Sequence, residues 1–263
     1  MRTIIVGDIH GCYREFITLL KKARYHSRTD RLILLGDLVD RGPMSFEMVR
    51  WVIRWKKKHP DNFFLIRGNH EQMWIDQPRD LDTKLIWRVV GKGATIRSFR
   101  KHKDRAQNYI PWFLDSMQLY HIDDSFRCVH AAVEHEDLEE NDVDRLVHDH
   151  GYARKNIYAG KITIIGHTPL PRPTHYDGTG GEGIPLPYHE KRHLPARGTI
   201  CIDTGCVFGD KLTAMIIEDG YYYLEYTDSK VCVKNRVHPY VDWIRTLCSL
   251  PLVRRFCSDS KIR

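Results

Sequence analysis

The chain has 263 residues, 42% of them hydrophobic, which supplies enough apolar surface for one large domain or two small ones. No stretch approaches the roughly 18 consecutive apolar residues of a membrane helix, and residues 3–6 begin a strand-like run without a signal-peptide pattern, so we expect no membrane partner and a cytoplasmic location. The formal net charge of +7 favours anionic partners without selecting one class of them.

The first half of the chain repeats one unit, in which an aliphatic run leads into a turn rich in Gly, Asp, Asn and His and then into a helical pattern. This alternation predicts an α/β fold. The three aliphatic runs predict strands over residues 2–6, 31–35 and 62–66.

Two helices are predicted between these strands. The first spans residues 13–23, and Pro43 can start the second, because its missing N–H is no loss at a helix N-terminus. Three lysines, Lys56, Lys57 and Lys58, close the second helix, where cations suit the negative end of the dipole. The apolar stripes expected to face the core are Phe16, Leu19 and Leu20 in the first helix and Met44, Met48, Trp51 and Trp55 in the second.

The middle of the chain, about residues 73–115, carries a helical pattern rich in aromatic and charged residues and is predicted to be an inserted lid. Strand signals return after it. A turn at Asp219 and Gly220 joins the last two strands. The later strands are expected at residues 118–122, 126–129, 161–165, 199–202, 212–217 and 221–226.

Two further segments lack strand periodicity. Residues 169–198 are rich in Pro, Gly, His and basic residues and are predicted to form a long surface loop. Residues 238–263 combine apolar residues at helical spacing with a basic end. We therefore predict a single domain over residues 1–237, with the helical insertion and the long loop inside it, followed by a C-terminal helical and basic tail.

The cysteines and the basic residues exclude some classes of site. No two cysteines have the CxxC spacing of zinc or redox motifs, so buried or free thiols are expected. The basic residues look scattered along the sequence and no nucleic-acid-binding motif accompanies them, so nucleic acid is not an expected partner. The seven cysteines are Cys12, Cys128, Cys201, Cys206, Cys232, Cys248 and Cys257.

Side chains that can bind metals follow directly after five of the predicted strands. Each one alone has an ordinary structural explanation, as a turn residue, a helix cap or a satisfied core histidine. Because the carboxyl ends of strands form the ligand-binding crevice of α/β sheets, their repetition at successive strand ends predicts one common site. The residues are Asp8, His10, Asp37, Asn69, His70, His130 and His167.

The chemical types of these side chains narrow the choice of metal. Carboxylate, imidazole and amide oxygen donors without thiolate suit Mn, Fe or Zn in an open site and do not suit a structural zinc. A carboxylate can bridge two cations about 3.5–4 Å apart. Asp37 stands at the centre of the series and is the predicted bridge, so we expect two divalent metal ions, with manganese favoured.

Six ordered motifs between residues 4 and 217 resemble those of the calcineurin-like metallophosphoesterases. More narrowly, they resemble the phosphoprotein phosphatase branch, with its bacterial and phage serine/threonine phosphatases and symmetrical diadenosine tetraphosphatases. The resemblance implies a sandwich of two mixed β-sheets flanked by helices, with a helical insertion. The motifs are GDIHG (7–11), GDLVDRG (36–42), GNHE (68–71), VHAAV (129–133), IIGHTP (164–169) and IDTGCVFGDKLTAM (202–215).

The resemblance also implies a role for each matching residue. The water shared by the two metals would attack phosphorus in line. Arg41 and Asn69 would contact the phosphate, His70 would protonate the leaving oxygen, and Asp40 would orient His70. The implied metal ligands are Asp8 and His10 for the first ion, Asp37 as the bridge, and Asn69, His130 and His167 for the second ion.

The sequence departs from the family pattern in two places. Ala132 replaces a glycine that the family commonly has next to the histidine of VHAAV. The second phosphate-binding arginine, which protein phosphatases of the family usually carry about two dozen residues before the GHT histidine, has no aligned counterpart. Arg145 or Arg154 could serve instead, or His148 could occupy the position.

These features leave two enzymatic functions open. The full GDLVDRG and GNHE motifs favour a serine/threonine protein phosphatase. The alternative is symmetrical hydrolysis of dinucleoside tetraphosphates, for which aromatic residues of the 73–115 insertion and basic residues of the 171–197 loop could supply a nucleoside pocket. A non-catalytic phosphate-binding protein is disfavoured, because all the implied ligands are present. The sequence predicts no oligomeric state.

Overall fold

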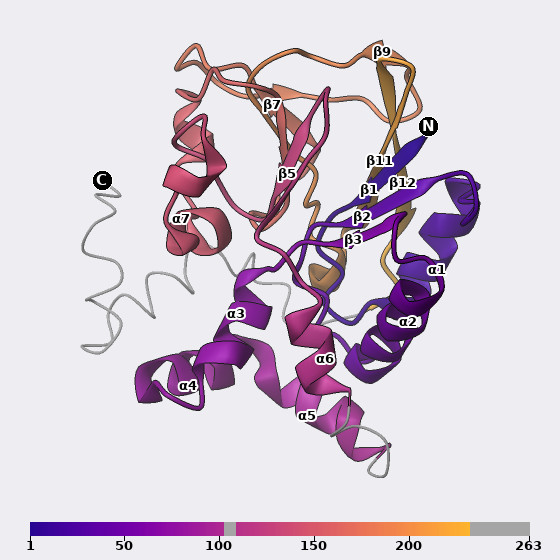
Figure 1. Ribbon diagram of the computed structural model, residues 1–263, viewed down its shortest axis with the longest axis vertical. Coiled ribbons are helices and arrows are strands. Elements are labelled where there is room, and N and C mark those ends of the chain that lie inside the picture. Colours follow the sequence, from indigo (N-terminus) through magenta and orange to yellow (C-terminus); the bar gives the residue numbers. More distant parts are fainter. Residues whose placement is uncertain (103–108, 232–263) are drawn as a thin grey trace. The chain divides into compact units, whose positions relative to one another are not determined.

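The computed structural model describes residues 1–102 and 109–231, so the predicted tail 238–263 lies outside the described residues, as do Cys232, Cys248 and Cys257 (Figure 1). Within the described ranges no helix is long and apolar enough to cross a membrane. The four described cysteines are free and buried, as the spacing of the cysteines predicted.

Two mixed six-stranded β-sheets form the centre of the fold. The first has the strand order β3-β2-β1-β11-β12-β9 and the second β4-β5-β6-β10-β7-β8. In the first, β1, β2 and β3 run parallel, and β11 runs antiparallel to β1. The strands of the first sheet are β1 (Thr3–Val6), β2 (Arg31–Leu34), β3 (Phe63–Leu65), β9 (Arg192–His193), β11 (Lys211–Glu218) and β12 (Tyr221–Asp228). Those of the second are β4 (Tyr120–Ile122), β5 (Arg127–Val129), β6 (Thr163–Ile165), β7 (Thr174–Tyr176), β8 (Ile184–Pro185) and β10 (Thr199–Cys201).

The alternation of side chains along β1 assigns its two faces to different cores. Ile4 and Val6 pack with the helices α1 (Tyr13–Lys22) and α2 (Ser45–Lys58). Ile5 belongs to the cluster that holds residues of the second sheet. Both faces of the strand are therefore buried, which explains its continuous apolar run. This sandwich confirms the architecture implied by the family resemblance.

The second sheet is covered on its outer face by the segment around α7 (Val143–His148). Val129, Ile165 and Cys201 from this sheet pack with Leu146 and Val147 of that helix. Figure 1 shows the resulting order of layers, with α7 on one flank, the two sheets between, and α1 and α2 on the other flank. Three short 3-10 helices connect strands: η2 (Leu138–Glu140), η3 (Ala153–Lys155) and η4 (Cys206–Phe208).

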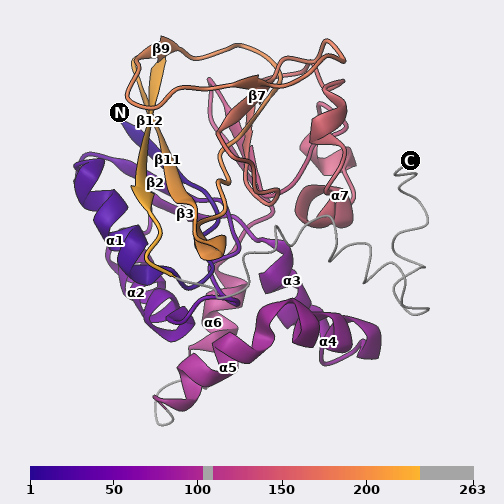
Figure 2. The same ribbon diagram turned by 180° about the vertical axis from the view of Figure 1, so that it is seen from behind.

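The segment after β3 is helical. Its helices lie together at one end of the sheets, below them in both Figure 1 and Figure 2. The Phe99 ring packs edge-on against Phe46 of α2, with ring centres 5.4 Å apart, so this helical segment is joined to the first sheet through α2. Its elements are α3 (Asn69–Asp76), α4 (Leu81–Trp87), the π-helix η1 (Arg88–Lys92), α5 (Gly93–Arg100) and α6 (Ile110–Asp115).

The second helix differs from the prediction at its start and in its buried face. It begins at Ser45 and not at Pro43, because residues 40 and 41 take left-handed conformations and the Ser45 hydroxyl accepts the Asp40 backbone N–H at 3.2 Å. Met48 is buried as expected. Trp51 and Trp55 lie at the rim of the core and are only partly buried. The buried apolar face consists of Phe46, Met48, Val49, Val52 and Ile53.

The segment 169–198, predicted as an irregular loop, contains the three short strands β7, β8 and β9. Each has only two or three residues and joins the sheets near their edges, so none is long enough to show an alternating pattern. The predicted turn between β11 and β12 is present, with positive φ at Asp219 (52°) and Gly220 (77°). This backbone is the one that favours Asp-Gly in a two-residue hairpin.

Candidate metal centre and active site

The predicted site residues follow the carboxyl ends of strands from both sheets. Asp8 and His10 follow β1, and Asp37 follows β2; Asn69 and His70 begin α3 after β3, whereas His130 and His167 follow β5 and β6. The described residues include nine non-glycine residues with positive φ, an uncommon conformation that clusters at functional sites. Five of the nine lie here: His10, Asp37, Asp40, Arg41 and His167.

Asp37 is shared by two groups of closely spaced donor atoms. One group contains His10, Asp37 and His70, and the other contains Asp37, His130 and His167. The two oxygens of Asp37 face different partners, with Oδ2 3.2 Å from His10 Nε2 and Oδ1 3.4 Å from His130 Nε2. The carboxylate therefore has the position of a bridge between two cations.

Backbone carbonyls fix the orientation of three imidazole rings. A carbonyl oxygen can only accept a hydrogen bond, so the ring nitrogen that meets it carries the proton and the other ring nitrogen keeps its lone pair. The lone pairs of His10 Nε2, His130 Nε2 and His167 Nδ1 therefore face the site. The three contacts are His10 Nδ1 with Val39 O (2.8 Å), His130 Nδ1 with Leu35 O (2.7 Å) and His167 Nε2 with His148 O (3.2 Å).

Around His130 the facing atoms are all acceptors. His167 Nδ1 lies 3.1 Å and Asn69 Oδ1 3.2 Å from His130 Nε2. Turning the Asn69 amide over would let its NH₂ group donate to Asp37, His130 and His167 instead, at 3.1–3.2 Å. The orientation with the oxygen inward suits a cation at the centre of the group, because only a positive charge satisfies four converging lone pairs.

Three buried carboxyl groups, of Asp8, Asp37 and Asp203, lie in the same region. Burial, together with the charges of Asp203 and Asp37, raises the pKa of Asp8 well above its usual value. Burial also raises the pKa of Asp203 to about 6. For Asp37 the nearby His70, His130 and His10 outweigh burial and hold the pKa well below its usual value. A concentration of buried carboxylates beside imidazole lone pairs fits divalent cations.

Asp8 is placed differently from the other candidate ligands. Its two oxygens accept the backbone N–H of His167, at 3.0 and 3.2 Å. The residue is 4% exposed and is not a member of either close group of donor atoms. It therefore links the β1 loop to the β6 loop across the sandwich.

His70 and Asp40 form a buried pair. His70 Nδ1 lies 2.7 Å from Asp40 Oδ2, whereas His70 Nε2 has no hydrogen-bond partner and lies 3.8 Å from Asp37 Oδ2. Burial lowers the pKa of His70 to about 4, an effect that Asp37 opposes and Arg41 reinforces. The imidazole is therefore oriented by a carboxylate and presents one nitrogen to the site.

Two residues that the sequence did not single out hold Asp40 in place. Burial alone would raise the pKa of Asp40, but hydrogen bonds from His70, the Thr95 hydroxyl and the Trp87 indole N–H hold it below its usual value. Thr95 also accepts the Asp40 backbone N–H at 2.9 Å. Both residues belong to the helical segment after β3, so that segment completes the Asp40–His70 pair.

The same helical segment positions Arg41. The Arg41 Nε donates to the Val90 carbonyl at 3.2 Å, and a guanidinium nitrogen contacts His10 Nε2. The guanidinium also lies over the Phe208 ring, 5.4 Å from its centre. The arginine fork thus ends beside the candidate metal ligands, where an anionic group of a substrate would meet it.

Glu71, the last residue of GNHE, is a further residue without a predicted role. Its carboxylate accepts backbone N–H groups of Asp37 (2.9 Å), Leu38 (2.8 Å) and Gly68 (3.1 Å). Burial and the nearby charge of Asp37 raise its pKa to about 8. Its carboxylate joins the loops after β2 and β3. The sequence contains a sign of this role, because an acidic residue at the third position of a helix commonly accepts the backbone N–H of the residue before the helix, here Gly68.

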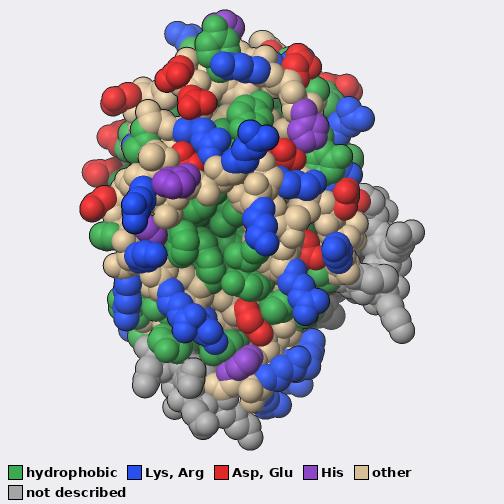
Figure 3. Space-filling model, turned by 90° about the vertical axis from the view of Figure 1, so that its right-hand side faces the viewer, with side chains coloured by type: hydrophobic (Ala, Val, Ile, Leu, Met, Phe, Trp, Pro, Cys, Tyr) green, Lys and Arg blue, Asp and Glu red, His purple; other side chains and the backbone are tan. Residues whose placement is uncertain are grey.

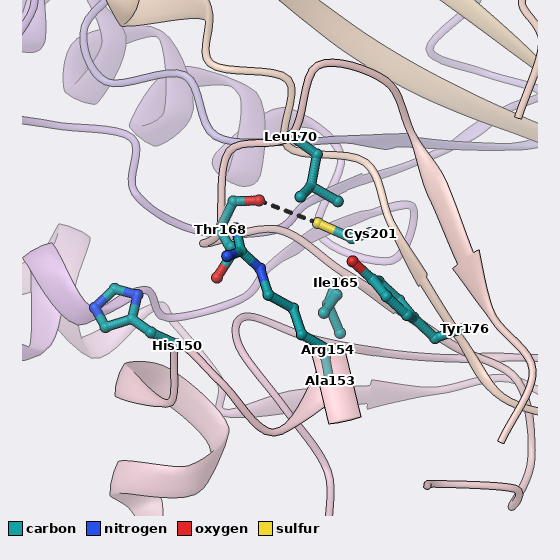
Figure 4. Close-up of a pocket in the computed structure, with 8 residues that line it drawn as sticks. All are labelled: His150, Ala153, Arg154, Ile165, Thr168, Leu170, Tyr176 and Cys201. Carbon is teal, nitrogen blue, oxygen red and sulfur yellow. Dashed lines mark hydrogen bonds between the residues drawn. The ribbon is translucent and has the colours of Figure 1, made fainter. Parts of the chain in front are cut away.

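The two arginines predicted as alternatives have different surroundings. Arg145 is paired with Glu134, at 2.7 Å, and with Asp149, and its guanidinium covers Tyr152. Arg154 lines a small pocket, and Figure 4 shows its side chain extending toward Thr168 and His150. The floor of this pocket is closed by Cys201, whose thiol donates to the Thr168 carbonyl at 3.4 Å.

This pocket adjoins the candidate metal centre. His150, which shares its lining with Arg154, stacks on the imidazole of His167 with ring centres 4.0 Å apart. Thr168 is the next residue after His167 in the chain. The His148 carbonyl accepts from His167, and the His148 ring contacts Asp144. Ala132, the other departure from the family pattern, is 1% exposed.

Comparison with known proteins identifies several relatives. The asymmetrical bis(5′-nucleosyl)-tetraphosphatase PrpE of Bacillus velezensis is 27% identical over 237 residues, covering 80% of this chain and 86% of that protein. The symmetrical bis(5′-nucleosyl)-tetraphosphatase of Nitrosospira multiformis is 28% identical over 272 residues, covering 83% and 94%. Serine/threonine-protein phosphatase 1 of Salmonella typhimurium is 27% identical over 236 residues, covering 81% and 91%.

Solved structures share the fold. A metallophosphoesterase from Sphaerobacter thermophilus superposes with a TM-score of 0.59 at 18% identity, covering 99% of this chain and all of that one. A protein serine/threonine phosphatase from Saccharomyces cerevisiae superposes with a TM-score of 0.57 at 15% identity, covering 87% and 80%. At these identities the likeness concerns the fold alone.

The family itself is identified over most of the chain. Residues 1–216 match the calcineurin-like phosphoesterase family. Its members use two divalent metals, and this chain has two candidate groups of ligands around Asp37. The named relatives confirm the resemblance to the phosphoprotein phosphatase branch. The chain therefore belongs to the calcineurin-like phosphoesterase family and is a metal-dependent phosphoric ester hydrolase.

Proposed function

We propose that this phosphoesterase hydrolyses phosphoserine and phosphothreonine in proteins, in the cytoplasm and with two manganese ions bound. The observation that carries the proposal is the buried Asp40–His70 pair, with His70 Nε2 free and 3.8 Å from the central carboxylate of Asp37. The four described cysteines are free thiols, which supports a reducing compartment.

The residues around Asp37 would hold the metals. When bound, two divalent cations lower the pKa of a water molecule and clamp the attacking and leaving oxygens of a phosphoryl displacement. The absence of thiolate among the donors supports manganese over a structural zinc, and leaves iron possible in the same geometry. The proposed ligands are Asp8 and His10 on one side, Asp37 as the bridge, and Asn69, His130 and His167 on the other.

The Asp40–His70 pair favours a phosphomonoester with a poor leaving group. A serine or threonine alkoxide is strongly basic and needs a proton as the ester bond breaks, whereas a nucleoside diphosphate leaves readily without one. His70 is neutral in the free protein at neutral pH, since its pKa is lowered to about 4. A phosphate dianion beside Nε2 raises the pKa of the ring and so favours protonation of His70 when the substrate is bound.

Two arginines would bind the phosphate group. Arg41 is held by Val90 with its guanidinium at the candidate metal ligands, and a planar fork of N–H groups matches phosphate oxygens in pairs. Asn69 would add an amide contact. For the second arginine, Arg154 is the proposed choice because of its position beside the candidate metal centre. Arg154 lines the pocket that also contains His150, the ring stacked on His167.

A second candidate function is hydrolysis of dinucleoside tetraphosphates, and two of the relatives carry that name. It requires an aromatic or apolar pocket for a nucleoside. The aromatic rings of the insertion argue against such a pocket there, because Trp74 packs on Trp87 and Phe99, and Trp87 bonds to Asp40. Among the basic residues of the 171–197 loop, Arg192 already pairs with Glu190 at 2.9 Å.

One experiment separates the two substrates. The purified protein, loaded with manganese, is given a phosphoserine peptide and, separately, diadenosine tetraphosphate. Release of inorganic phosphate from the peptide, with kcat/KM at least about tenfold above that for the dinucleotide, is the expected result. Faster formation of ADP from the dinucleotide would make the second candidate the function. Turnover of neither substrate with any divalent metal would refute both.

A substitution tests the proposed bridge. Asp37→Asn keeps the size of the side chain and removes its charge, so both metal ions and the phosphatase activity should be lost together. Metal content is measured by elemental analysis of the purified variant, with wild-type protein as the reference. Two bound metals per chain in Asp37→Asn would remove Asp37 from the bridging role.

A further inference from the structure

The positive charge of this protein is concentrated in two neighbouring segments. Residues 13–28 and 45–61 contain ten Lys and Arg but only three acidic residues, Glu15, Glu47 and Asp61. The rest of the chain before residue 232 contains 24 Lys and Arg against 29 Asp and Glu. The two segments therefore carry a net charge of +7, whereas the rest of the chain before residue 232 has a negative net charge. Their basic residues are Arg14, Lys21, Lys22, Arg24, Arg28, Arg50, Arg54, Lys56, Lys57 and Lys58.

Folding brings both segments to the same flank of the molecule. They form α1, its following loop and α2, which lie side by side on the outer face of the first sheet. None of the ten basic side chains forms an ion pair with a described residue, whereas Arg2, Arg31 and Arg145 are all paired. Of the three acids within the segments, Glu15 is buried and Glu47 faces Ser98 of the insertion, so only the exposed Asp61, which lies near Lys56, offsets a cation of this face.

Aromatic side chains lie among these cations. Trp51 and Trp55 stack with ring centres 4.8 Å apart, and the indole N–H of Trp55 donates to the Tyr25 hydroxyl at 3.0 Å. All three are only partly buried, as are Tyr13 and Ile17 of α1. Figure 3 shows this flank, with hydrophobic side chains gathered at its centre and Lys and Arg around them. The sequence predicted Trp51 and Trp55 as core residues, and this rim position leaves part of each ring open to a partner.

We propose that this basic-aromatic face, formed by α1, the loop after it and α2, binds a single-stranded nucleic acid. Unpaired cations on one face follow a phosphate backbone, and partly exposed rings offer platforms on which unpaired bases stack. The sequence showed only scattered basic residues and did not predict this partner. The inference is independent of the proposed phosphatase function, because the face is built from residues outside the candidate catalytic site.

The charge distribution favours this partner over two others. A lipid surface would be met by cations with apolar side chains protruding between them, but here Trp55 is hydrogen-bonded to Tyr25 and stacked on Trp51, and all three rings pack at the core rim. An acidic peptide would be attracted by the cations but would make no stacking contact with the aromatic rings. On the opposite flank, residues 134–149 carry eight acidic residues and one arginine, so the protein has one flank that attracts polyanions and one that repels them.

A salt titration with a matched control tests the proposal. A fluorescein-labelled single-stranded RNA of about 20 nucleotides is titrated with protein, and anisotropy gives Kd at several salt concentrations. The face variant is Lys21→Gln with Arg54→Gln and Lys58→Gln, three exposed residues without described side-chain partners. The control variant is Lys84→Gln with Arg88→Gln and Lys101→Gln, three exposed residues on the helical insertion with the same change in charge.

We expect wild type and control to bind the RNA with the same salt dependence. The face variant should bind at least about tenfold more weakly, and the slope of log Kd against log salt should fall by about 2, since each lost phosphate contact on a single strand contributes about 0.7. Hydrolysis of p-nitrophenyl phosphate should be equal in all three proteins, which shows that each is folded and keeps its catalytic site.

Base stacking is tested by tryptophan fluorescence. RNA should quench it, and heparin, which has charge but no bases, should not. Equal weakening in the control variant, or heparin binding as tightly as RNA without any RNA-specific quenching, would overturn the proposal. So would binding to phosphatidylserine vesicles or to polyglutamate in preference to RNA. These outcomes do not depend on which phosphate ester the catalytic site hydrolyses.

Discussion

Single hydrogen bonds decide what each side chain of the site can do. Val39, Leu35 and His148 offer carbonyl oxygens to His10, His130 and His167, and each carbonyl selects the tautomer that turns a lone pair inward. His70 differs, because its outer nitrogen meets the carboxylate of Asp40. The first three rings are thereby suited to hold a cation and the fourth to exchange a proton.

Replacing His70 by Asn separates these two roles. His70→Asn should leave both metals bound and reduce kcat on a phosphoserine peptide by about 10² or more, because the leaving alkoxide loses its proton donor. With p-nitrophenyl phosphate, whose leaving group needs no proton, the loss should be much smaller. Steady-state kinetics on both substrates, with metal analysis, measures this. Loss of one metal together with activity would instead make His70 a ligand.

Thr95 is expected to act through Asp40. Thr95→Val keeps the shape of the side chain and removes the hydroxyl that donates to the Asp40 carboxylate and accepts its backbone N–H. The unfolding free energy should fall by about 1–3 kcal/mol, because buried polar atoms lose their partner. The peptide kcat should also fall, with KM little changed. Thr18→Val, on the exposed side of α1, is the control and should change neither quantity.

At the scale of elements, the helical insertion holds two residues of the candidate catalytic site, Arg41 and Asp40. Its π-helix η1 provides the Val90 carbonyl that holds Arg41 and contains Gly91 with φ of 137°. A Cβ at Gly91 would lie 2.7 Å from Arg41 Cγ and 2.9 Å from its backbone nitrogen. The glycine therefore permits the close approach that fixes the arginine.

Gly91→Ala should weaken substrate binding. The added methyl group must displace Arg41, so KM for a phosphopeptide should rise by about tenfold or more while the metals stay bound. Gly93→Ala is the matched control, since its Cβ would meet only the end of the flexible Arg97 side chain at 3.2 Å. Equal KM values for the two variants would exclude the proposed link between η1 and Arg41.

The β4 strand carries a pH-dependent contribution to stability. His121 packs against Phe64, with ring centres 4.3 Å apart, and its Nε2 has no hydrogen-bond partner. Burial lowers its pKa to about 4, with Arg31 adding to the effect. Between the usual histidine pKa of about 6.5 and this value, the unfolded chain binds a proton at this position that the folded chain does not.

Lowering the pH through that window should therefore destabilise the wild type more than His121→Phe. Urea unfolding of both metal-free proteins at several pH values measures the effect. The difference between the two free energies of unfolding should be constant above about pH 7 and should shift in favour of the variant toward pH 4. His135→Phe, in an exposed loop, is the control. A constant difference over the whole range would contradict the assigned cause.

For the whole molecule, the two sheets meet at the candidate metal centre. Asp8, His10 and Asp37 come from the loops of the first sheet, and His130 and His167 from those of the second. Bound cations would hold the sheets together at this edge and neutralise buried carboxylates. Metal binding is therefore expected to contribute to folding as well as to catalysis.

Removal of metal should lower the thermal stability. At a metal concentration 100 times Kd, binding adds about 2.7 kcal/mol to the free energy of unfolding. Treatment with a chelator should reduce Tm, and added manganese should restore it. Asp37→Asn serves as the control, because it should show no change in Tm with manganese. A wild-type Tm that is independent of metal would show that the ligands do not bind ions in the folded protein.

Much of the candidate site could be predicted because its residues follow strands directly. Aliphatic runs such as residues 2–6 and 31–35 predict strands. The polar residues that directly follow such a run must then lie at the end of that strand, at the edge of the sheet. The donor types then limit the chemistry. The residues that orient the site were not predictable in this way. Thr95 and Trp87 reach Asp40 across 55 and 47 positions of the chain.

The sequence by itself determined an α/β chain whose polar strand ends carry a metal-binding donor set, because these are properties of neighbouring residues. Only the tertiary structure decided that β9, β11 and β12 return to the first sheet while the other strands after the insertion form the second, that Arg145 pairs with Glu134, and that scattered cations of α1 and α2 share one face. The physical reason is that periodicity reports which side of an element is buried, whereas the partner that covers it depends on contacts between distant segments.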